Sequence, residues 1–347
     1  MLSRLSRMKG VVLLALLVGL LIFTLVKNGT IYMQPQVSSV PAAYGVNVDI
    51  SAMLPDTPYT LTTGSGGNFF DLATQLGINT VRITDVQWEM TGKEYPQSSW
   101  QYVFNEAASH HIRIVLLLLD SSRGDPVTQQ AHTLLGTYKL AHADALWMVD
   151  LYNEPDVANL HLMATLRQEA TYVRQVAPEA RITIGGWKSQ VPGHPGEFRW
   201  QDPEDIPRFI DLVDVVSPHL YAFDQETLFG ITPQEWTRSF LNAVRQNSQR
   251  KPILLEEFGA GNGLAPTTSG RLTGSPEWQA RVYRGVLQEV QAETHQGLLG
   301  AMAWLMAPRP AWSGDIQGNM TGWAFVLDHG HRLLAAASVF SEAAAHA

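Results

Sequence analysis

Two stretches decide the fold of this chain: LWMVDLYNEP at residues 146–155 and ILLEEFG at residues 253–259. Both contain short apolar runs rich in Val, Ile and Leu, without strict alternation of apolar and polar residues. This pattern is typical of strands that are covered on both faces in a parallel sheet. Each run closes with acidic residues, followed by a proline in one case and a Phe-Gly pair in the other.

Six further runs of the same kind recur along the chain, at residues 44–50, 78–84, 112–120, 182–187, 215–221 and 298–304. With residues 146–153 and 253–258 they make eight. Their first residues lie between 33 and 45 positions apart. That spacing leaves room for one helix and two short connections after each strand.

The segments between the runs carry helix signals. Residues 68–76 and 100–110 place apolar side chains at i, i+3 and i+4 spacing. The segment TPQE at 232–235 combines a capping Thr, a Pro at the first helical position and a Glu that can complete a capping box. The segments SPE at 275–277 and DPE at 202–204 predict two more helix starts.

Eight strand–helix units predict a single (β/α)8 TIM barrel over residues 43–347. The alternative is an open doubly wound sheet. That fold would need a glycine-rich phosphate turn after the first strand, and the sequence VNVD at 46–49 is not one. Because barrel active sites lie at the carboxyl ends of the strands, the residues at those ends are the candidates for function.

The first 27 residues predict a membrane anchor. An uncharged stretch of 17 residues, 10–26, follows the basic residues Arg4, Arg7 and Lys9. Its length falls at the lower limit for one transmembrane helix, and no small-residue cleavage site follows it. Residues 28–42 then form a linker. We expect a single-pass protein of the cell membrane with its main domain outside the cytoplasm; a cleaved signal peptide or a buried amino-terminal helix is the alternative.

Composition excludes several classes of function. The chain has no cysteine, which rules out disulfides and thiolate chemistry. Its net charge is −8, and no basic cluster follows Lys27, so nucleic acid is not expected as a partner. The histidine pairs at 110–111 and at 329 and 331 lack carboxylates at ligand spacing, so we expect neither a metal nor another cofactor. The oligomeric state stays open.

Polar residues stand at the ends of six predicted strands: Arg82, Asp120, Asn153, Glu154, His219, Tyr221, Glu257 and Trp304. The fourth and seventh strands lie on opposite sides of an eight-strand ring, so Glu154 and Glu257 would face each other. Two facing carboxyl groups are what cleavage of a glycosidic bond requires, with one acting as acid and the other as nucleophile or base. Glu256 competes with Glu257, but alternation along a strand would turn only one of them inward.

Four short motifs in this order resemble the clan A glycoside hydrolases, and the cellulase and mannanase family of that clan most closely: Asn153-Glu154-Pro155, His219-x-Tyr221, Glu257-Phe258-Gly259 and Trp304. The resemblance covers residues 44–340. It implies that Glu154 is the acid/base, that Glu257 is the nucleophile and that the anomeric configuration is retained. The mechanism needs a low pKa at one carboxyl group and a high pKa at the other.

The resemblance also implies the roles of the surrounding side chains. Asn153 would bind the sugar 2-hydroxyl, Arg82 and Tyr221 would keep Glu257 ionised, His219 would orient the two carboxyl groups, and Trp304 would form the floor of the sugar site. A surface ion pair for Arg82 and a plain core position for Tyr221 are the alternatives.

Some features depart from the family or remain less defined. Many relatives have a histidine where the third strand of this chain ends in Asp120, which either belongs to the site or caps a loop. Trp88, Trp187 and Trp312 follow predicted strands and could stack on sugars. The long segments 259–274 and 307–322 would wall the site.

The sequence therefore predicts a cofactor-free retaining hydrolase of β-linked polysaccharide or oligosaccharide. A transglycosylase would use the same residues and differ only in its acceptor. A catalytically silent carbohydrate-binding barrel and a barrel hydrolase of another class are the remaining alternatives.

Overall fold

The computed structural model describes residues 41–55, 68–119, 127–221, 230–264, 274–306, 322–327 and 332–346. The predicted anchor at residues 1–27 lies outside this part of the chain. Among the described residues, no helix combines the length and the apolar character needed to span a membrane.

Eight parallel strands form the central sheet: β1 (Ala43–Asp49), β2 (Thr80–Thr84), β3 (Arg113–Leu117), β4 (Leu146–Asn153), β5 (Arg181–Gly185), β8 (His219–Leu220), β9 (Ile253–Phe258) and β10 (Leu298–Ala303). The order in the sheet runs β5-β4-β3-β2-β1-β10-β9-β8. A parallel bridge between Gly185 and Ser217 joins the two ends of this order. The sheet is thus a ring, as the eight apolar runs predict.

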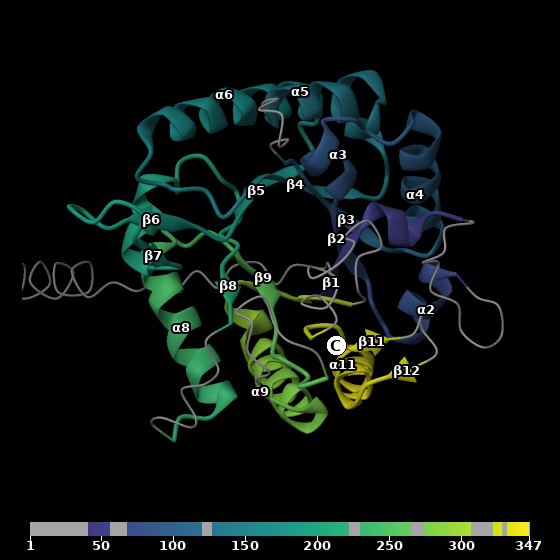
Figure 1. Ribbon diagram of the computed structural model, residues 1–347, viewed down its shortest axis with the longest axis vertical. Helices are drawn as coiled ribbons and strands as arrows, with labels where there is room; N and C mark the ends of the chain where they lie inside the picture. The colour runs from purple at the N-terminus through teal and green to yellow at the C-terminus, as the bar shows by residue number, and fades with distance from the viewer. Residues whose placement is uncertain are drawn as a thin grey trace, which may run out of the picture. The chain divides into compact units, whose positions relative to one another are not determined.

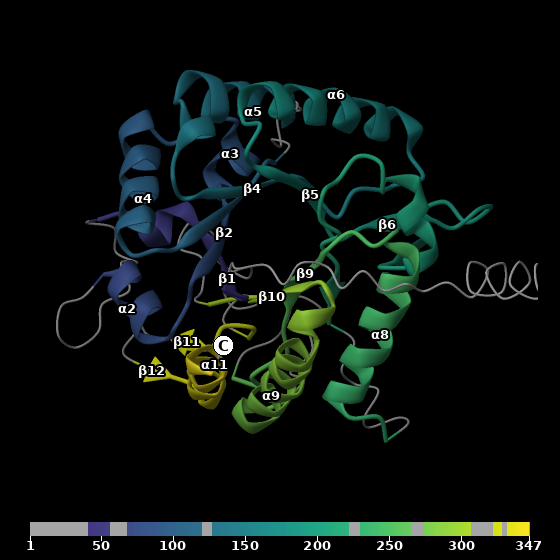
Figure 2. The ribbon, with the colours of Figure 1, turned by 180° about the vertical axis from the view of Figure 1, so that it is seen from behind.

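Helices surround the ring (Figures 1 and 2). The α-helices are α2 (Phe69–Gln75), α3 (Val86–Thr91), α4 (Gln97–Ser109), α5 (Val127–Ala131), α6 (Leu160–Val176), α8 (Pro233–Asn247), α9 (Pro276–Glu293) and α11 (Ala335–Ala345). Short 3₁₀ segments are η1 (Ile50–Met53), η3 (Leu140–His142), η4 (Pro203–Arg208) and η5 (Thr294–Gln296), and η2 (His132–Thr137) is π-helical. Two antiparallel pairs complete the described structure: β6 (Lys188–Gln190) with β7 (Phe198–Trp200), and β11 (Val326–Leu327) with β12 (Arg332–Leu333).

The predicted helix caps are confirmed in two places. Thr232 and Glu235 form the capping box of α8, and the Ser275 side chain accepts a hydrogen bond from the Trp278 N–H at the start of α9. The α-helix predicted to start at Asp202 is wrong, because the 3₁₀ segment η4 begins there instead. Pro207 lies inside this segment and has no N–H to bond the carbonyl of Pro203, so an α-helix cannot form there.

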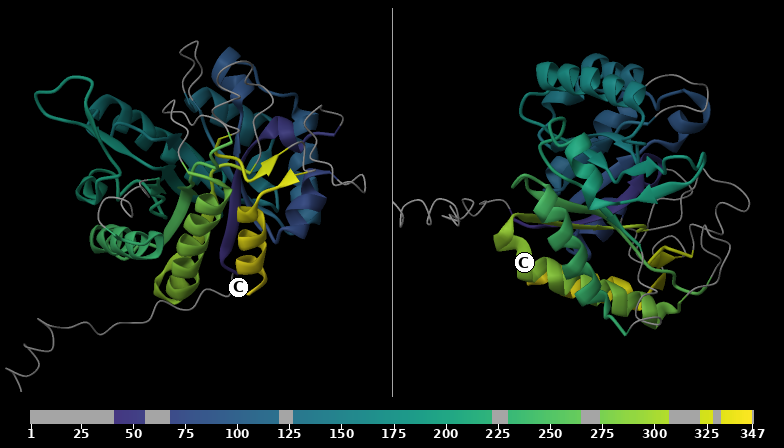
Figure 3. Two further views of the ribbon diagram at one scale, coloured as in Figure 1. Left: turned by 60° about the horizontal axis from the view of Figure 1, so that its bottom comes forward. Right: turned by 90° about the vertical axis from the view of Figure 1, so that its left-hand side faces the viewer.

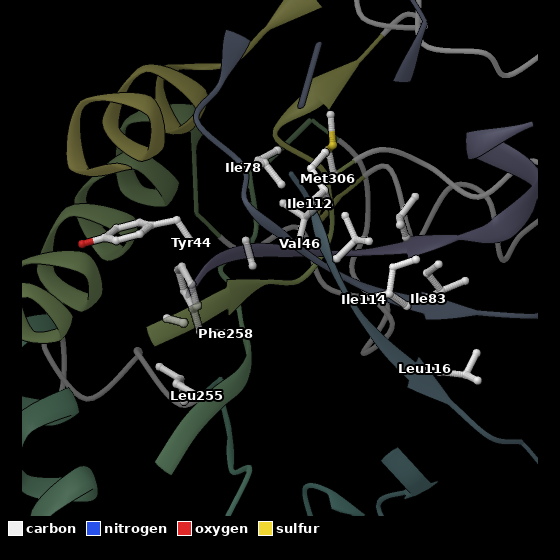
Figure 4. Packing of buried hydrophobic residues seen from close by; sticks show 14 of the residues in the cluster. Tyr44, Val46, Ile78, Ile83, Ile112, Ile114, Leu116, Leu255, Phe258 and Met306 are labelled. Atoms are coloured by element: carbon white, nitrogen blue, oxygen red, sulfur yellow. The ribbon is translucent and has the colours of Figure 1, made fainter. Parts of the chain in front are cut away.

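The core lies in two layers. The larger one fills the space between the ring and the helices, and Figure 4 shows part of it around Val46, Leu255 and Phe258. The smaller one lies inside the ring, where side chains from six strand segments meet: Ala43, Val115, Met148, Val215, Leu254 and Met302. In Figure 3, α9 and α11 run side by side along the outside.

Helix α6 buries one charged side chain in the outer layer. Glu169 is 1 % exposed, and neither carboxylate oxygen has a hydrogen-bond partner among the described residues. Burial raises the pKa of Glu169 to about 7 from an ordinary value of 4.5. The fold therefore favours the protonated form, and this contribution to stability is present below pH 4.5 and is lost as the pH rises to about 7.

We expect Glu169→Gln to remove this pH dependence, because glutamine keeps the shape and cannot ionise. Relative to the wild type, the variant should gain about 3 kcal/mol of unfolding free energy between pH 4 and pH 8. Urea unfolding at a series of pH values measures it, with Glu179→Gln at an exposed position as the control. An equal stability difference at every pH would contradict the assignment.

Candidate active site

Arg82 lies at the centre of the polar residues inside the ring. It projects from β2 and its side chain is fully buried. Five side chains from β1, β4 and β9 contact its guanidinium: Asp150 at 2.6 and 2.9 Å, Glu257 at 2.5 Å, Asn153 at 2.9 Å, Asn47 at 3.0 Å and Glu256 at 3.5 Å. The guanidinium thus joins the strands that carry the two candidate catalytic carboxyl groups.

Two irregularities in the sheet make this convergence possible. On β9, Leu255 and Phe258 pair with Ala301 and Ala303 of β10, so Glu256 and Glu257 together stand opposite one residue. Both flanking side chains point into the outer core (Figure 4), although three positions separate them. An extra residue of this kind is a β-bulge, which interrupts the alternation of faces.

The same device occurs on β4. Asp150 and Asn153 pair with Thr183 and Gly185 of β5, so two residues, Leu151 and Tyr152, stand opposite one. Strict alternation would place Asp150 and Asn153 on opposite faces, yet both hydrogen-bond to Arg82. Because of the two bulges, the expectation that only one of Glu256 and Glu257 turns inward is wrong: both carboxyl groups reach Arg82.

The neighbouring strand β5 approaches the cluster through a glycine. A Cβ at Gly185 would lie 2.3 Å from Arg82 Nη2, 2.6 Å from Asp150 Oδ2 and 2.8 Å from Glu256 Oε2. Its N–H also donates to Asp150 Oδ1 at 2.7 Å. Any larger residue would therefore displace the charged groups, and we attribute the glycine to this close approach.

Among the carboxyl groups around Arg82, Glu256 is the one whose protonated form burial favours most. Burial and, after it, the negative charge of Asp150 raise the pKa of Glu256 well above its ordinary value, and Arg82 offsets this only in part. Asp150 receives two hydrogen bonds from the guanidinium, whereas the Glu256 oxygens have none from any described residue. The neutral form of Glu256 is accordingly favoured.

Glu257 is held from three directions at the carboxyl end of β9. Arg82 contacts Oε1, the Tyr221 hydroxyl donates to Oε2, and His219 Nδ1 lies 3.4 Å from Oε2. Burial and the charge of Glu257 raise the pKa of Tyr221 well above 10, so the phenol keeps its proton and serves as a donor. The Glu257 side chain is 7 % exposed, which leaves one edge accessible.

Glu154 lies directly after β4 in a left-handed conformation, with φ of 53°, and its N–H donates to the Gly185 carbonyl. This conformation costs a non-glycine residue on the order of 1 kcal/mol or more, and such residues are often found at functional sites. Its carboxylate is 26 % exposed and lies 3.0 Å from His219 Nδ1.

The pKa of Glu154 is lowered, whereas a general acid is expected to have a raised pKa. Burial raises its pKa, but the hydrogen bond and charge of His219, with the charges of Lys188 and Arg82, outweigh burial and lower the pKa below its ordinary value. The ionised form is therefore favoured at rest, with His219 as its nearest proton donor.

The histidine also limits the distance between the two candidate carboxyl groups. Nδ1 lies 3.0 Å from Glu154 Oε1 and 3.4 Å from Glu257 Oε2, so these oxygens are separated by no more than the sum, 6.4 Å. Carboxyl groups of retaining glycosidases are about 5–5.5 Å apart and those of inverting ones about 6.5–9.5 Å.

The structure brings together six of the residues that the sequence singles out: Arg82, Asn153, Glu154, His219, Tyr221 and Glu257. Trp304 follows β10, and its carbonyl lies 2.4 Å from where a Cβ at Gly259 would be. Asp120 falls outside the described residues, as do Trp312 and most of residues 259–274 and 307–322.

Two tryptophans proposed for sugar stacking are core residues instead. Trp88 is 3 % exposed and donates its indole N–H to the Leu119 carbonyl, and Trp187 is fully buried and donates to the Asp202 carbonyl. A different tryptophan, Trp323, packs edge-on against Tyr221 with ring centroids 5.4 Å apart. The sequence did not identify Trp323 as a site residue, because it follows no predicted strand.

Sequence patterns missed Asn47 and Asp150 as members of the site. Asn47 accepts from Arg82 and donates to the carbonyls of Glu256 and Ala303, and so links β1 to β9 and β10. Both residues are polar interruptions within buried apolar strands, which is the signal that could have identified them. Among the described residues, no group of three His, Asp or Glu side chains could hold a metal ion.

Comparison of the sequence with protein-family models and with curated proteins finds no match. Solved structures do match. A family 2 β-galacturonidase from Eisenbergiella tayi bound to galacturonate has a TM-score of 0.62 at 16 % identity, over 88 % of this chain and 51 % of that one. An endo-β-1,4-mannanase from Thermotoga petrophila has a TM-score of 0.55 at 15 % identity, over 90 % and 78 %.

A family 5 mannosidase from Rhizomucor miehei has a TM-score of 0.53 at 14 % identity, over 90 % of this chain and 94 % of that one. This chain thus spans about half of the galacturonidase but nearly the whole mannosidase. At these identities the likeness concerns the fold: the chain has a (β/α)8 barrel like the barrels of these glycoside hydrolases.

Proposed function

We propose that the protein is a retaining glycoside hydrolase that cleaves β-linked polysaccharide or oligosaccharide. The observation that carries this proposal is the bridging position of His219, which keeps the nearest oxygens of Glu154 and Glu257 within 6.4 Å. Two carboxyl groups that share one histidine contact are close enough to act on the two sides of a single glycosidic bond, and that spacing is compatible with retention. The structural neighbours, named as a galacturonidase, a mannanase and a mannosidase, support the same reaction class.

In the first step, the Glu257 carboxylate attacks the anomeric carbon and Glu154 protonates the departing oxygen. Arg82 and Tyr221 bind the two oxygens of Glu257, which fixes the orientation of the nucleophile and stabilises its charge. Glu154 has to be protonated to act as the acid, and His219 Nδ1, 3.0 Å from Oε1, orients its carboxyl group.

In the second step, Glu154 acts as a base and activates the water that hydrolyses the glycosyl-enzyme. Asn153 accepts a hydrogen bond from Arg82 through its amide oxygen, so its amide nitrogen is the group that can donate to the sugar 2-hydroxyl. Trp323, whose ring packs against Tyr221, supplies aromatic surface for the sugar bound there, and we assign Trp304, directly after β10, to the same surface.

The amino-terminal sequence supports a second proposal, on where this activity takes place. We propose that residues 1–27 anchor the protein in the cell membrane and that the barrel faces a glycan outside the cytoplasm. A screen of the full-length chain against β-glucan, mannan, xylan and galactan tests the activity and identifies the sugar.

Glu257→Ala should lower kcat on the best glycan by roughly 10⁴-fold or more, because no other group replaces the nucleophile. Added azide or formate should restore part of the activity by entering the vacated space. The adjacent Glu256→Gln should retain activity within about threefold, since burial already favours the neutral form of this carboxyl group. Loss of activity in Glu256→Gln together with normal activity in Glu257→Ala would reverse the assignment.

The pH profile should depend on His219. The alkaline limb of kcat/KM reports loss of the proton from the general acid of the free enzyme. Because His219 lowers the pKa of Glu154 and burial raises it, His219→Leu should move this limb to higher pH. His219→Gln, which keeps a donor but removes the charge, should move it less. A limb that stays in place in both variants, or moves to lower pH, would show that Glu154 is not the acid.

A further inference from the structure

The hairpin formed by β6 and β7 places a lysine over two neighbouring aromatic rings. Lys188 Nζ lies 4.8 Å from the Trp200 ring centroid and 5.2 Å from that of Phe198. Trp200 is 53 % exposed, which is unusual for so large an apolar side chain. Figure 1 shows the hairpin leaving the barrel next to β5. An exposed aromatic ring with a cation beside it can bind a ligand that has both an apolar face and a negative charge.

The base of this hairpin is attached to the candidate active site at two points. The Lys188 N–H donates to the Pro155 carbonyl at 3.0 Å, and Pro155 directly follows Glu154. At the other end, Gln201 Oε1 accepts from the His219 N–H at 3.1 Å. The lysine charge is among those that lower the pKa of Glu154, which places it electrostatically close to that carboxylate.

The charge of Lys188 has no acidic partner in the described structure. No carboxylate there lies within 4 Å of its ammonium, whereas its neighbour Arg199 contacts Asp202 at 3.1 Å and Asp205 at 3.3 Å. The two cations of the hairpin thus differ: Arg199 is paired with two aspartates, whereas the ammonium of Lys188, among the described residues, lies over the faces of two rings and has no carboxylate in contact. Because its ammonium donates to no carboxylate in the described structure, Lys188 can form a charge-assisted hydrogen bond with an anion that enters from solvent.

We propose that the β6–β7 hairpin binds the leaving-group sugar and that this sugar carries a negative charge, as a uronic acid does. The inference rests on the proposed function, because Glu154 protonates the leaving oxygen and the hairpin adjoins Glu154. Trp200 stacks on the apolar face of the sugar, and Lys188 pairs with its carboxylate. The substrate would therefore be an acidic glycan, cleaved on the non-reducing side of a charged residue.

Binding can be tested without turnover. The full-length chain is labelled with 5-fluorotryptophan, and the Trp200 signal in the ¹⁹F spectrum is assigned by its loss in Trp200→Phe. Methyl β-glucuronide is titrated against methyl β-glucoside, and the galacto and manno pairs follow. We expect at least one acidic glycoside to shift the Trp200 signal with about tenfold lower Kd than its neutral counterpart.

The variants separate the two contacts. Lys188→Met should abolish the preference for the acidic glycoside, whereas Trp200→Ala, measured by calorimetry, should weaken both members of a pair alike. Lys139→Met removes the same charge before β4, at the opposite end of the barrel, and should leave the preference intact. Equal affinity for acidic and neutral glycosides, or a preference that survives Lys188→Met, would overturn the inference.

The binding test of the hairpin and the activity test of the proposed hydrolase can succeed or fail independently. An active hydrolase that binds both kinds of glycoside equally refutes only the inference. A protein that turns over no glycan, yet shows the Lys188-dependent preference, refutes hydrolysis and supports the hairpin as a site for acidic sugars.

Discussion

The burial of one guanidinium is the constraint on which the rest of the site depends. A fully buried charge is costly unless ion pairs and hydrogen bonds replace its hydration. Arg82 obtains these ion pairs and hydrogen bonds from residues on β1, β4 and β9. A shift of these strands relative to one another would therefore leave the buried guanidinium without partners. The same contacts position the nucleophile candidate Glu257 and the amide of Asn153. Stability and function are therefore coupled at this residue, because two of the groups that compensate the buried charge, Glu257 and Asn153, are also those that would contact the sugar.

The two β-bulges explain how a regular barrel can bring so many polar groups to one point. Without them, Glu256 and Glu257 would point to opposite faces, as would Asp150 and Asn153. The bulges stand on the two strands that carry the candidate acid and nucleophile. Deeper in the ring, burial favours the neutral form of Glu256, which limits the negative charge around Arg82. Nearer the carboxyl end, Glu257 retains its contacts with Tyr221 and His219.

Much of this arrangement could be predicted from the sequence, because the strand runs and their polar ends depend on local pattern. The bounds of β4 and β9 agree with prediction to the residue. The bulges could not be predicted, since an extra residue leaves no compositional trace. Trp88 and Trp187 were placed correctly after strands, but burial depends on partners that are distant in the chain. The β6–β7 hairpin was missed because its strands are three residues long and lack an apolar run.

These features describe a site in which a shared histidine sets the distance between two carboxyl groups and a charged hairpin lies beside one of them. The central claim is that Glu257 forms a covalent bond to the sugar, and the most direct test is the anomeric configuration of the first product. Proton NMR of the reaction on the best substrate, recorded before mutarotation, should show the β-anomer. Initial release of the α-anomer would mean that water attacks directly, and would contradict the account.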